Sequence, residues 1–321
     1  MKPFQSACFV TGAHMDIAAR LFDFPVYGSS NPGRLVRQPG GAGLNAASVA
    51  ASLGLSSSLA GPVGDDAHGQ EIRNAAAERA IADRLVTLAG EPSGSYTAVM
   101  APDGEMVIGI ADLAIYESVD ADWLLENCAD ALSSASLWFL STNLGKQTLA
   151  DLAAQAGGRL LAAATISPAK AVRLLPCLAE LDLIFTNVKE ARALVAASQT
   201  GLSDADAPML ARAIAASGVK AGVITQGGKE AIFWQHGKFG SIQPPRLDHV
   251  TDVNGAGDAL AGAVLAGLAL GRSLADALPP AIIAAQLTLA SPLPFIEGLD
   301  QATLDRLAAG IKAVQIDSQT R

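Results

Sequence analysis

Cysteine is scarce in this chain of 321 residues. The three that are present, Cys8, Cys128 and Cys177, are odd in number and far apart. They can form neither a disulfide framework nor a CxxC metal pair, so the composition fits a reducing compartment such as the cytoplasm. Isolated cysteines of this kind are usually buried apolar thiols.

Basic residues are fewer than acidic ones. Lys and Arg number 22 against 31 Asp and Glu, the formal net charge is −9, and no basic or aromatic array is visible. Nucleic-acid affinity rests largely on Lys and Arg that neutralise phosphates, so we expect no nucleic-acid partner. A small anionic ligand is still compatible, because its site needs only a local positive potential.

Long lipid-compatible runs are missing as well. The uncharged stretches 38–64 and 277–296 are long enough to cross a bilayer. The first is too rich in Gly and Ser, and the second contains four prolines and is expected to be a buried helix between turns. The first ten residues are too quickly interrupted for a signal peptide. We therefore expect no membrane partner and a cytoplasmic protein.

Apolar residues, by contrast, make up 50% of the chain and charged residues only 17%, which excludes a disordered polypeptide. Short apolar runs alternate with longer Ala- and Leu-rich segments. Uninterrupted apolar strands between helices predict a mostly parallel central sheet flanked by helices on both faces, an α/β fold. The expected strands are 7–11, 59–63, 137–141, 160–165, 183–187 and 221–225, and the expected helices are 45–53, 68–79, 147–155, 169–175, one from about 189, and 207–217.

Two parts of the chain break this rhythm and carry no helical period. One of them alternates around a turn at Pro102, Asp103 and Gly104, as a hairpin should. Inserted strands in an α/β chain commonly form a side sheet over the ligand cleft. We predict a single domain over residues 1–321, with lid strands inserted at about 14–37 and 94–117.

The most informative segment is the glycine-rich stretch that ends in Asp258. Gly255 and Gly257 flank Ala256, so the backbone can approach a ligand closely just before a helical run begins. Backbone N–H groups at a helix N-terminus suit a phosphate. An aspartate there makes sense as a general base that takes a hydroxyl proton during phosphoryl transfer. The alternative is a packing turn with a helix-start carboxylate, and the residues alone leave both open.

Two signatures in the chain resemble those of the ribokinase-like carbohydrate and nucleoside kinases, the PfkB family. Residues 252–258 are similar to the family's Asp-Thr-x-Gly-Ala-Gly-Asp, with Val253 in place of Thr, and residues 40–47 are similar to its diglycine signature. Two signatures in the right order are more specific than either alone. The resemblance covers essentially the whole chain. It implies a ribokinase-like fold and an ATP- and Mg²⁺-dependent kinase that phosphorylates a hydroxymethyl group.

The same resemblance implies roles for the residues that match the family's motifs. Asp258 would be the base, and the N–H groups of Gly255, Ala256 and Gly257 the anion hole. Asn187 and Glu190 match the Asn-x-x-Glu motif, which would hold water around Mg²⁺, although the pair alone could be a helix cap. The implied nucleotide-binding residues are Asn187, Thr225, Gly227 and Asn254, and Asp252 matches a position used for a monovalent cation such as K⁺.

For the substrate, the resemblance points to Asp16, because a carboxylate can accept from two vicinal hydroxyls. Gly41 and Asn45 would complete this anchor, and His14 is expected to be structural. Segments 29–33, 95–117 and 165–170 resemble the pseudouridine kinases of the family, which suggests phosphorylation of pseudouridine at its 5′-hydroxyl. Asn31, Asp112 and Lys170 are then candidate contacts to the base.

Other activities stay open at this stage. Leu44 and Ala164 depart from the pseudouridine kinase pattern, so ribose, adenosine or 2-keto-3-deoxygluconate are alternative substrates. A sensor that binds a nucleoside without turnover would be expected if the glycine loop or Asp258 were lost. Both are intact here, which disfavours the sensor. A nicotinamide or flavin oxidoreductase is disfavoured because no G-x-G-x-x-G follows the first strand. Relatives commonly form homodimers through the lid, so we expect a homodimer.

Overall fold

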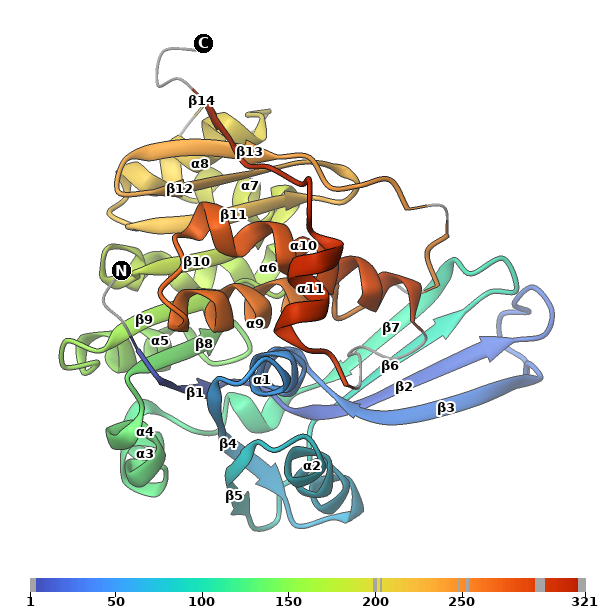
Figure 1. The fold of residues 1–321 in the computed structure, drawn as a ribbon. Coiled ribbons are helices and arrows are strands. Elements are labelled where there is room, and N and C mark those ends of the chain that lie inside the picture. The colour runs from blue at the N-terminus through green and yellow to red at the C-terminus, as the bar shows by residue number, and fades with distance from the viewer. Residues whose placement is uncertain are drawn as a thin grey trace.

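The protein is described by a computed structural model that covers residues 4–198, 201–202, 204–247, 249–251, 254–291 and 298–316. Ten strands in these ranges form the central sheet, in the order β14-β13-β12-β11-β10-β9-β8-β1-β4-β5 (Figure 1). They are β1 (Ser6–Val10), β4 (Ser56–Gly64), β5 (Ala82–Leu88), β8 (Leu137–Ser141), β9 (Leu160–Ala164), β10 (Leu183–Asn187), β11 (Ala221–Gln226), β12 (Lys229–Gln235), β13 (Lys238–Ile242) and β14 (Val314–Ile316).

From β5 across to β11 every neighbouring pair of strands is parallel, which confirms the mostly parallel sheet. Beyond β11 the pairing turns antiparallel. The sequence analysis did not predict these edge strands. A turn at Gly227, where φ is +64°, joins β11 to β12, and so short a connection permits only antiparallel pairing.

Helices cover both faces of this sheet, as expected. On one face pack α1 (Ala42–Ser52), α2 (Ala67–Glu78), α9 (Ala256–Ala269), α10 (Leu274–Ala290) and α11 (Gln301–Leu307). On the other face pack α3 (Ala121–Asn127), α4 (Ala129–Ser134), α5 (Lys146–Ala154), α6 (Pro168–Ala171), α7 (Val188–Ala196) and α8 (Ala207–Ala216). Side chains alternate along each central strand, so Phe9 enters the first core and Cys8 the second.

One expectation about helices needs correction. The single helix predicted over 169–175 is instead the short α6 followed by a 3₁₀ segment, η2 (Val172–Glu180), which contains Pro176. A proline inside a helix removes a backbone donor and crowds the preceding turn, so a regular α-helix does not continue there. The buried helix expected in the uncharged run that begins at residue 277 is confirmed over residues 277–290, which belong to α10; this helix continues through Pro279 and Pro280. Residues 292–296 of the run lie outside the described ranges. No helix in the described ranges is long and apolar enough to span a bilayer.

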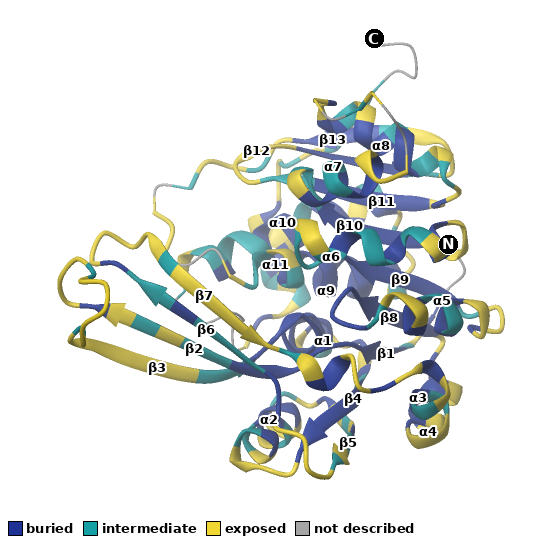
Figure 2. Cartoon of the chain, turned by 180° about the vertical axis from the view of Figure 1, so that it is seen from behind, coloured by how far each residue is buried: buried dark blue, intermediate teal, exposed yellow. Residues whose placement is uncertain are grey.

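A second sheet forms the lid. Its strands are β2 (His14–Leu21), β3 (Gly33–Gly40), β6 (Ser95–Met100) and β7 (Met106–Asp112), in the order β3-β2-β6-β7. The hairpin turn that joins β6 to β7 contains Gly104 at φ +88°, as predicted. Figure 2 shows these strands extending away from the buried core, with exposed residues along much of their length. A short 3₁₀ helix, η1 (Ala114–Tyr116), leads back from the lid to α3.

The topology defines where a ligand can bind. The chain passes from β1 into the lid at Gly12, and strands β8, β9, β10 and β11 end in short polar segments. In a parallel sheet these carboxyl ends lie along one edge, which is the usual place for a ligand cleft. The lid therefore extends from the binding edge of the sheet.

Candidate active site

A cleft of about 1150 Å³ lies between the carboxyl ends of the central strands and the lid. Ligand pockets usually measure about 300–1,000 Å³, so this one has room for more than one small molecule. Its lining combines the lid, the N-terminal ends of α1 and α9, and the residues that follow β8, β9 and β10. The cleft therefore collects groups that are far apart in the sequence.

Two helices begin at this cleft. Gly41 precedes α1 at φ +92°, and Gly255 precedes α9 in the left-handed conformation at φ +76°. Neither helix has a side chain that caps its first N–H groups. These N–H groups and the positive ends of the two helix dipoles favour an anionic ligand at this part of the cleft.

Asp258 lies in the first turn of α9, on the floor of the cleft. Its Oδ2 accepts a hydrogen bond from Asn45 Nδ2 at 3.1 Å, which joins α9 to α1. The surrounding protein atoms desolvate the carboxylate and raise its pKa to about 6, and the charge of Asp16 contributes to the rise. A carboxylate with a pKa nearer to neutrality is a better general base than an exposed one.

Asp16 and His14 lie at the base of the lid and face the same cleft. His14 Nε2 is 3.0 Å from Asp16 Oδ1, so the imidazole holds the carboxylate in place. This contact agrees with the structural role expected for His14. Gly41 permits it, because a Cβ at this position would be 2.7 Å from His14 Nδ1.

Three buried polar atoms at this end of the cleft have no hydrogen-bond partner among the described residues. They are His14 Nδ1, Asn45 Oδ1 and Asn143 Nδ2. Buried polar atoms are almost always satisfied in folded proteins. These three unsatisfied atoms lie on the lining of one cleft, where the hydroxyl groups of a bound ligand would satisfy them. They therefore suit a binding site for a polyhydroxylated molecule.

Lys170, in α6, reaches the same end of the cleft. Its Nζ donates a hydrogen bond to Asn143 Oδ1 at 3.0 Å. Burial lowers the pKa of this amine, and the nearby positive charge of Arg173 lowers it further. The predicted contact residue Lys170 therefore lines the same cleft as Asp16, Asn45 and Asp258, and its substrate role stays a prediction.

Asn187 and Glu190 form a capping box at the start of α7. Asn187 Oδ1 accepts from the N–H groups of Lys189 and Glu190, and Glu190 Oε2 accepts from Asn187 N at 3.2 Å. The helix cap that was the alternative to a Mg²⁺ site is therefore present. Both side chains nevertheless also line the cleft. Burial raises the pKa of Glu190. A desolvated carboxylate beside an amide oxygen fits a water-mediated Mg²⁺ site.

Within the described ranges, no three acidic, His or Cys side chains gather into a group that could hold a metal ion directly. Mg²⁺ usually keeps several waters and binds through one or two carboxylates plus ligand phosphates, so a full protein cage is not required. Glu190 is the carboxylate available for that role at this edge of the cleft.

Two of the three remaining predicted nucleotide residues line the cleft. Thr225 at the end of β11 and Asn254 before α9 both line it, and Gly227 forms the turn that follows β11. Asp252, the candidate cation ligand, lies outside the described residues. The nucleotide and cation assignments stay predictions.

Two predicted base contacts are not part of the cleft lining. Asn31 lies in the loop between β2 and β3, where its side chain accepts from Val26 N and donates to Val26 O and Ser29 O. Asp112 ends β7, and its neighbours Ala111 and Leu113 line the cleft instead. Because successive strand residues point to opposite faces, Asp112 points away. In this lid position neither side chain contacts the cleft.

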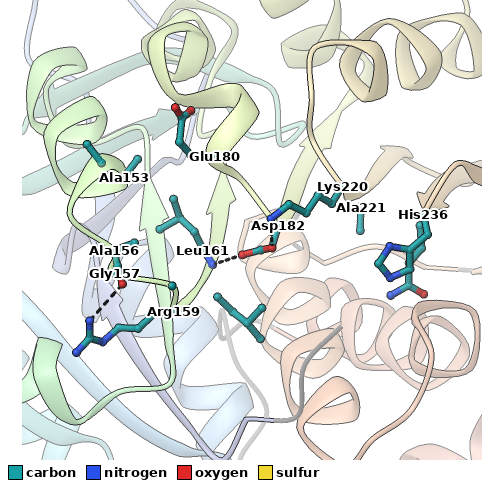
Figure 3. A pocket seen from close by; sticks show the side chains of 14 residues that line it. Ala153, Ala156, Gly157, Arg159, Leu161, Glu180, Asp182, Lys220, Ala221 and His236 are labelled. Atoms are coloured by element: carbon teal, nitrogen blue, oxygen red, sulfur yellow. Dashed lines mark hydrogen bonds and ion pairs between the residues drawn. The ribbon is translucent and has the colours of Figure 1, made fainter.

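A second cavity, of about 560 Å³, lies at the opposite ends of β9, β10 and β11 (Figure 3). In this cavity Asp182 accepts hydrogen bonds from Lys220 Nζ at 2.8 Å and from Leu161 N at 2.9 Å, and Arg159 donates to Ala156 O. The cavity contains none of the motif residues. The cleft under the lid is therefore the better candidate for the active site.

Sequence reasoning missed several residues of the cleft. Asn143 comes two residues after the buried strand β8, and Asn187 is the last residue of β10, so a polar residue at the end of an apolar strand was a usable signal. Arg20 and Arg34 line the cleft from the lid. Their orientation depends on the register of β2 and β3, which the sequence analysis did not establish.

Comparison with known proteins places this architecture in a family. The model of the pfkB family carbohydrate kinases matches residues 8–294 of the chain. A pseudouridine kinase from Escherichia coli (strain K12) is 26% identical over 261 residues, which cover 81% of each chain.

Solved structures agree with this family. A carbohydrate kinase from Agrobacterium tumefaciens is 31% identical with a TM-score of 0.83, covering 97% of this chain and 100% of the other. Arabidopsis thaliana ribokinase, solved with ribose and ATP, is 21% identical with a TM-score of 0.78, covering 96% and 99%. The expected ribokinase-like fold is confirmed.

Proposed function

We propose that this chain, which belongs to the pfkB family of carbohydrate kinases, transfers the γ-phosphoryl group of ATP to the 5′-hydroxyl of pseudouridine. The observation that carries the proposal is the position of Asp258. It lies on the first turn of an uncapped helix and, through Asn45, beside the polar groups at the base of the lid. This arrangement supports a role for Asp258 as a base beside a phosphate site.

The chemistry requires one bond to form and one to break. The 5′-oxygen attacks the γ-phosphorus, the bond to the β-phosphate oxygen breaks, and ADP leaves. Asp258 takes the hydroxyl proton, while the N–H groups of Gly255, Ala256 and Gly257 stabilise charge on the transferring group. Asp16, Gly41 and Asn45 hold the sugar so that the reacting oxygen faces Asp258.

Asn187 and Glu190 are suited to hold Mg²⁺ through water beside the phosphates, with Thr225, Gly227 and Asn254 contacting the nucleotide. A bound Mg²⁺ ion would neutralise charge on the β- and γ-phosphates. Burial of Glu190 supports this role, because a desolvated carboxylate gains more from a nearby cation than an exposed one. Activation by K⁺ at Asp252 is part of the same proposal.

The choice of pseudouridine rests on finer evidence. The E. coli relative carries that name, and Lys170 and Asn143 offer polar groups at the substrate end of the cleft. A site built to pair the polar atoms of one base rejects a ligand that leaves them unpaired. Asn31 and Asp112 could take part only if the lid changed its position. Ribose, adenosine and 2-keto-3-deoxygluconate are the alternative substrates.

A substrate panel tests the proposal. ATP-to-ADP turnover with Mg²⁺ should be fastest with pseudouridine and lower by on the order of 10² or more in kcat/KM with uridine, whose N1 carries the ribose and so lacks the second ring N–H of pseudouridine. Adenosine, ribose and 2-keto-3-deoxygluconate complete the panel. Preference for one of these would contradict the substrate and leave the chemistry at Asp258. No turnover, with ATP still bound, would instead indicate a nucleoside sensor.

We also propose that the chain forms a cytoplasmic homodimer through the outer face of the lid. Leu35, Ala19, Val99 and Ile108 stand in register across all four lid strands and form an apolar row. Leu35 is 69% exposed and Ile108 54%. Apolar sheet faces of this kind usually mark an interface. A second copy of the lid presents a matching row.

The dimer proposal predicts a change of mass on substitution. Light scattering should give about twice the 32.6 kDa chain mass for the wild type and the single-chain mass for Ile108→Lys. Leu307→Lys, at an exposed apolar residue of α11 away from the lid, is the control and should stay dimeric. A wild-type protein that is monomeric at micromolar concentration would contradict the proposal.

A further inference from the structure

The register of the lid strands divides its cleft face into three rows. Outward from the His14–Gly40 pair, the first row contains Gln38, Asp16, Tyr96 and Ala111, and the second contains Val36, Ala18, Ala98 and Gly109. The third, the basic row, contains Arg34 and Arg20 beside Met100 and Met106. The basic row has no role in the proposed chemistry.

Arg20 and Arg34 are direct cross-strand partners, and both line the cleft. Neither guanidinium group makes an ion pair or a side-chain hydrogen bond with any residue that the structure describes. Like charges directly opposite each other destabilise a sheet. Arg37, on the other face of β3, is in contrast paired with Glu71 at 3.2 Å. The unpaired arginines are therefore restricted to the cleft side of the lid.

We propose that Arg20 and Arg34 together bind a phosphate group at the outer end of the cleft. Directly opposed residues have Cβ atoms only about 5 Å apart, so two planar guanidinium groups can reach one phosphate. Charge-assisted bidentate hydrogen bonds of this type are among the strongest in proteins. A phosphate would also relieve the repulsion between the two arginines.

The position of the row limits which phosphate this is. Arg20 is four residues from Asp16 along β2, roughly 13 Å at the usual strand rise, so it cannot contact the sugar hydroxyls held at Asp16. The phosphate must belong to ATP or be one that the acceptor already carries. This inference rests on the proposed kinase function for the presence of such molecules in the cleft.

Charge balance in the cleft supports the assignment. Its lining contains the carboxylates of Asp16, Glu190 and Asp258, and in the described residues Lys170 is its only Lys or Arg besides the pair. A triphosphate or sugar phosphate entering a protein of net charge −9 needs local positive charge. Movement of the lid toward the sheet would bring the arginine row to the negative charge of the phosphate.

Binding measurements test the proposal without any turnover. Wild type, Arg20→Ala, Arg34→Ala, the corresponding Lys variants and the control Arg37→Ala would be titrated calorimetrically. The probes are a non-hydrolysable ATP analogue and ribose 5-phosphate, each at low and high salt. Loss of a charge-assisted contact should weaken one probe by about 10- to 100-fold in each Ala variant. The Lys variants should be intermediate, because they keep the charge but lose the planar fork.

The outcomes separate the two sources of phosphate. Weaker binding of the ATP analogue alone would identify the nucleotide, and weaker binding of ribose 5-phosphate alone would identify a phosphorylated acceptor. Equal binding by wild type and both Ala variants, an equal loss in Arg37→Ala, or no binding of either probe to wild type would overturn the proposal. Failure of the substrate panel would leave these titrations interpretable, so the two hypotheses can fail separately.

Thermal unfolding of the free proteins provides a check on folding. Because each Ala variant removes one of two opposed like charges, its midpoint should equal or exceed that of the wild type. A lower midpoint for both Ala variants would mean that the arginines stabilise the lid itself and would also overturn the proposal.

Discussion

Asp258→Asn should lower turnover by on the order of 10²–10⁴ while leaving nucleotide binding largely intact. The amide is nearly isosteric with the carboxylate, and its oxygen can still accept the hydrogen bond that Asn45 Nδ2 donates. What it cannot do is take the hydroxyl proton. Steady-state turnover and calorimetric binding of an ATP analogue together separate loss of the base from loss of the site.

The matched control for Asp258→Asn is Asp206→Asn. Asp206 also lies at a helix N-terminus, where its side chain accepts from Met209 N, but it is not part of the cleft lining. Asparagine is an equally good N-cap, so activity and stability should be unchanged. Unchanged turnover in Asp258→Asn would show that Asp258 is not the base.

The pH profile of the wild type is a further readout of this substitution. Since the pKa of Asp258 is raised to about 6, the carboxylate is the dominant form above that pH and is protonated below it. Below about pH 6, kcat/KM should therefore fall about tenfold per pH unit. The low-pH fall should be absent from the residual activity of Asp258→Asn.

Gly262→Val should destabilise the protein and remove most of its activity. A Cβ at Gly262 of α9 would lie 2.3 Å from Ala46 O and 3.1 Å from Ala50 N of α1. The two helices must then separate, at a cost of about 1–3 kcal/mol or more in the free energy of unfolding. The same packing holds Asn45 beside Asp258, so the site is disturbed together with the core.

The smaller substitution Gly262→Ala tests the close contact between α9 and α1 more directly. At an exposed helix position this change stabilises by about 1 kcal/mol, whereas here the contact with the α1 backbone should reverse the sign. Urea unfolding measures the difference. Gly228→Ala is the control, because a Cβ there meets nothing within 4 Å. A Gly262→Ala protein as stable as the wild type would show that the helices do not approach this closely.

Much of the fold could be predicted from local patterns. The strands expected at 137–141 and 183–187 coincide with β8 and β10, and the glycine loop before Asp258 leads directly into α9. In each case neighbouring residues in the chain carry the whole signal, either a buried apolar strand or a tight turn before a helix. The antiparallel edge strands β12 to β14 lacked such a signal.

Local patterns did not determine which side chains of the lid face the cleft. The existence of the lid and its hairpin turn were predicted, but Asn31 and Asp112 were placed at the cleft, and the structure directs both elsewhere. Since side chains alternate along a strand, a single position in the register decides which of two neighbours faces the ligand. That register placed Arg20 and Arg34 at the cleft instead.

The sequence by itself determined the alternation of strands and helices, the glycine turn and the presence of Asp258 in the first turn of a helix. These depend on backbone freedom and on the spacing of apolar residues, which act over a few residues. Only the tertiary structure decided that Asn45, Asp16, Asn143 and Lys170 share one cleft with Asp258. It did so because the close packing of α1 against α9, and the strand register of the lid, join segments that have no contact along the chain.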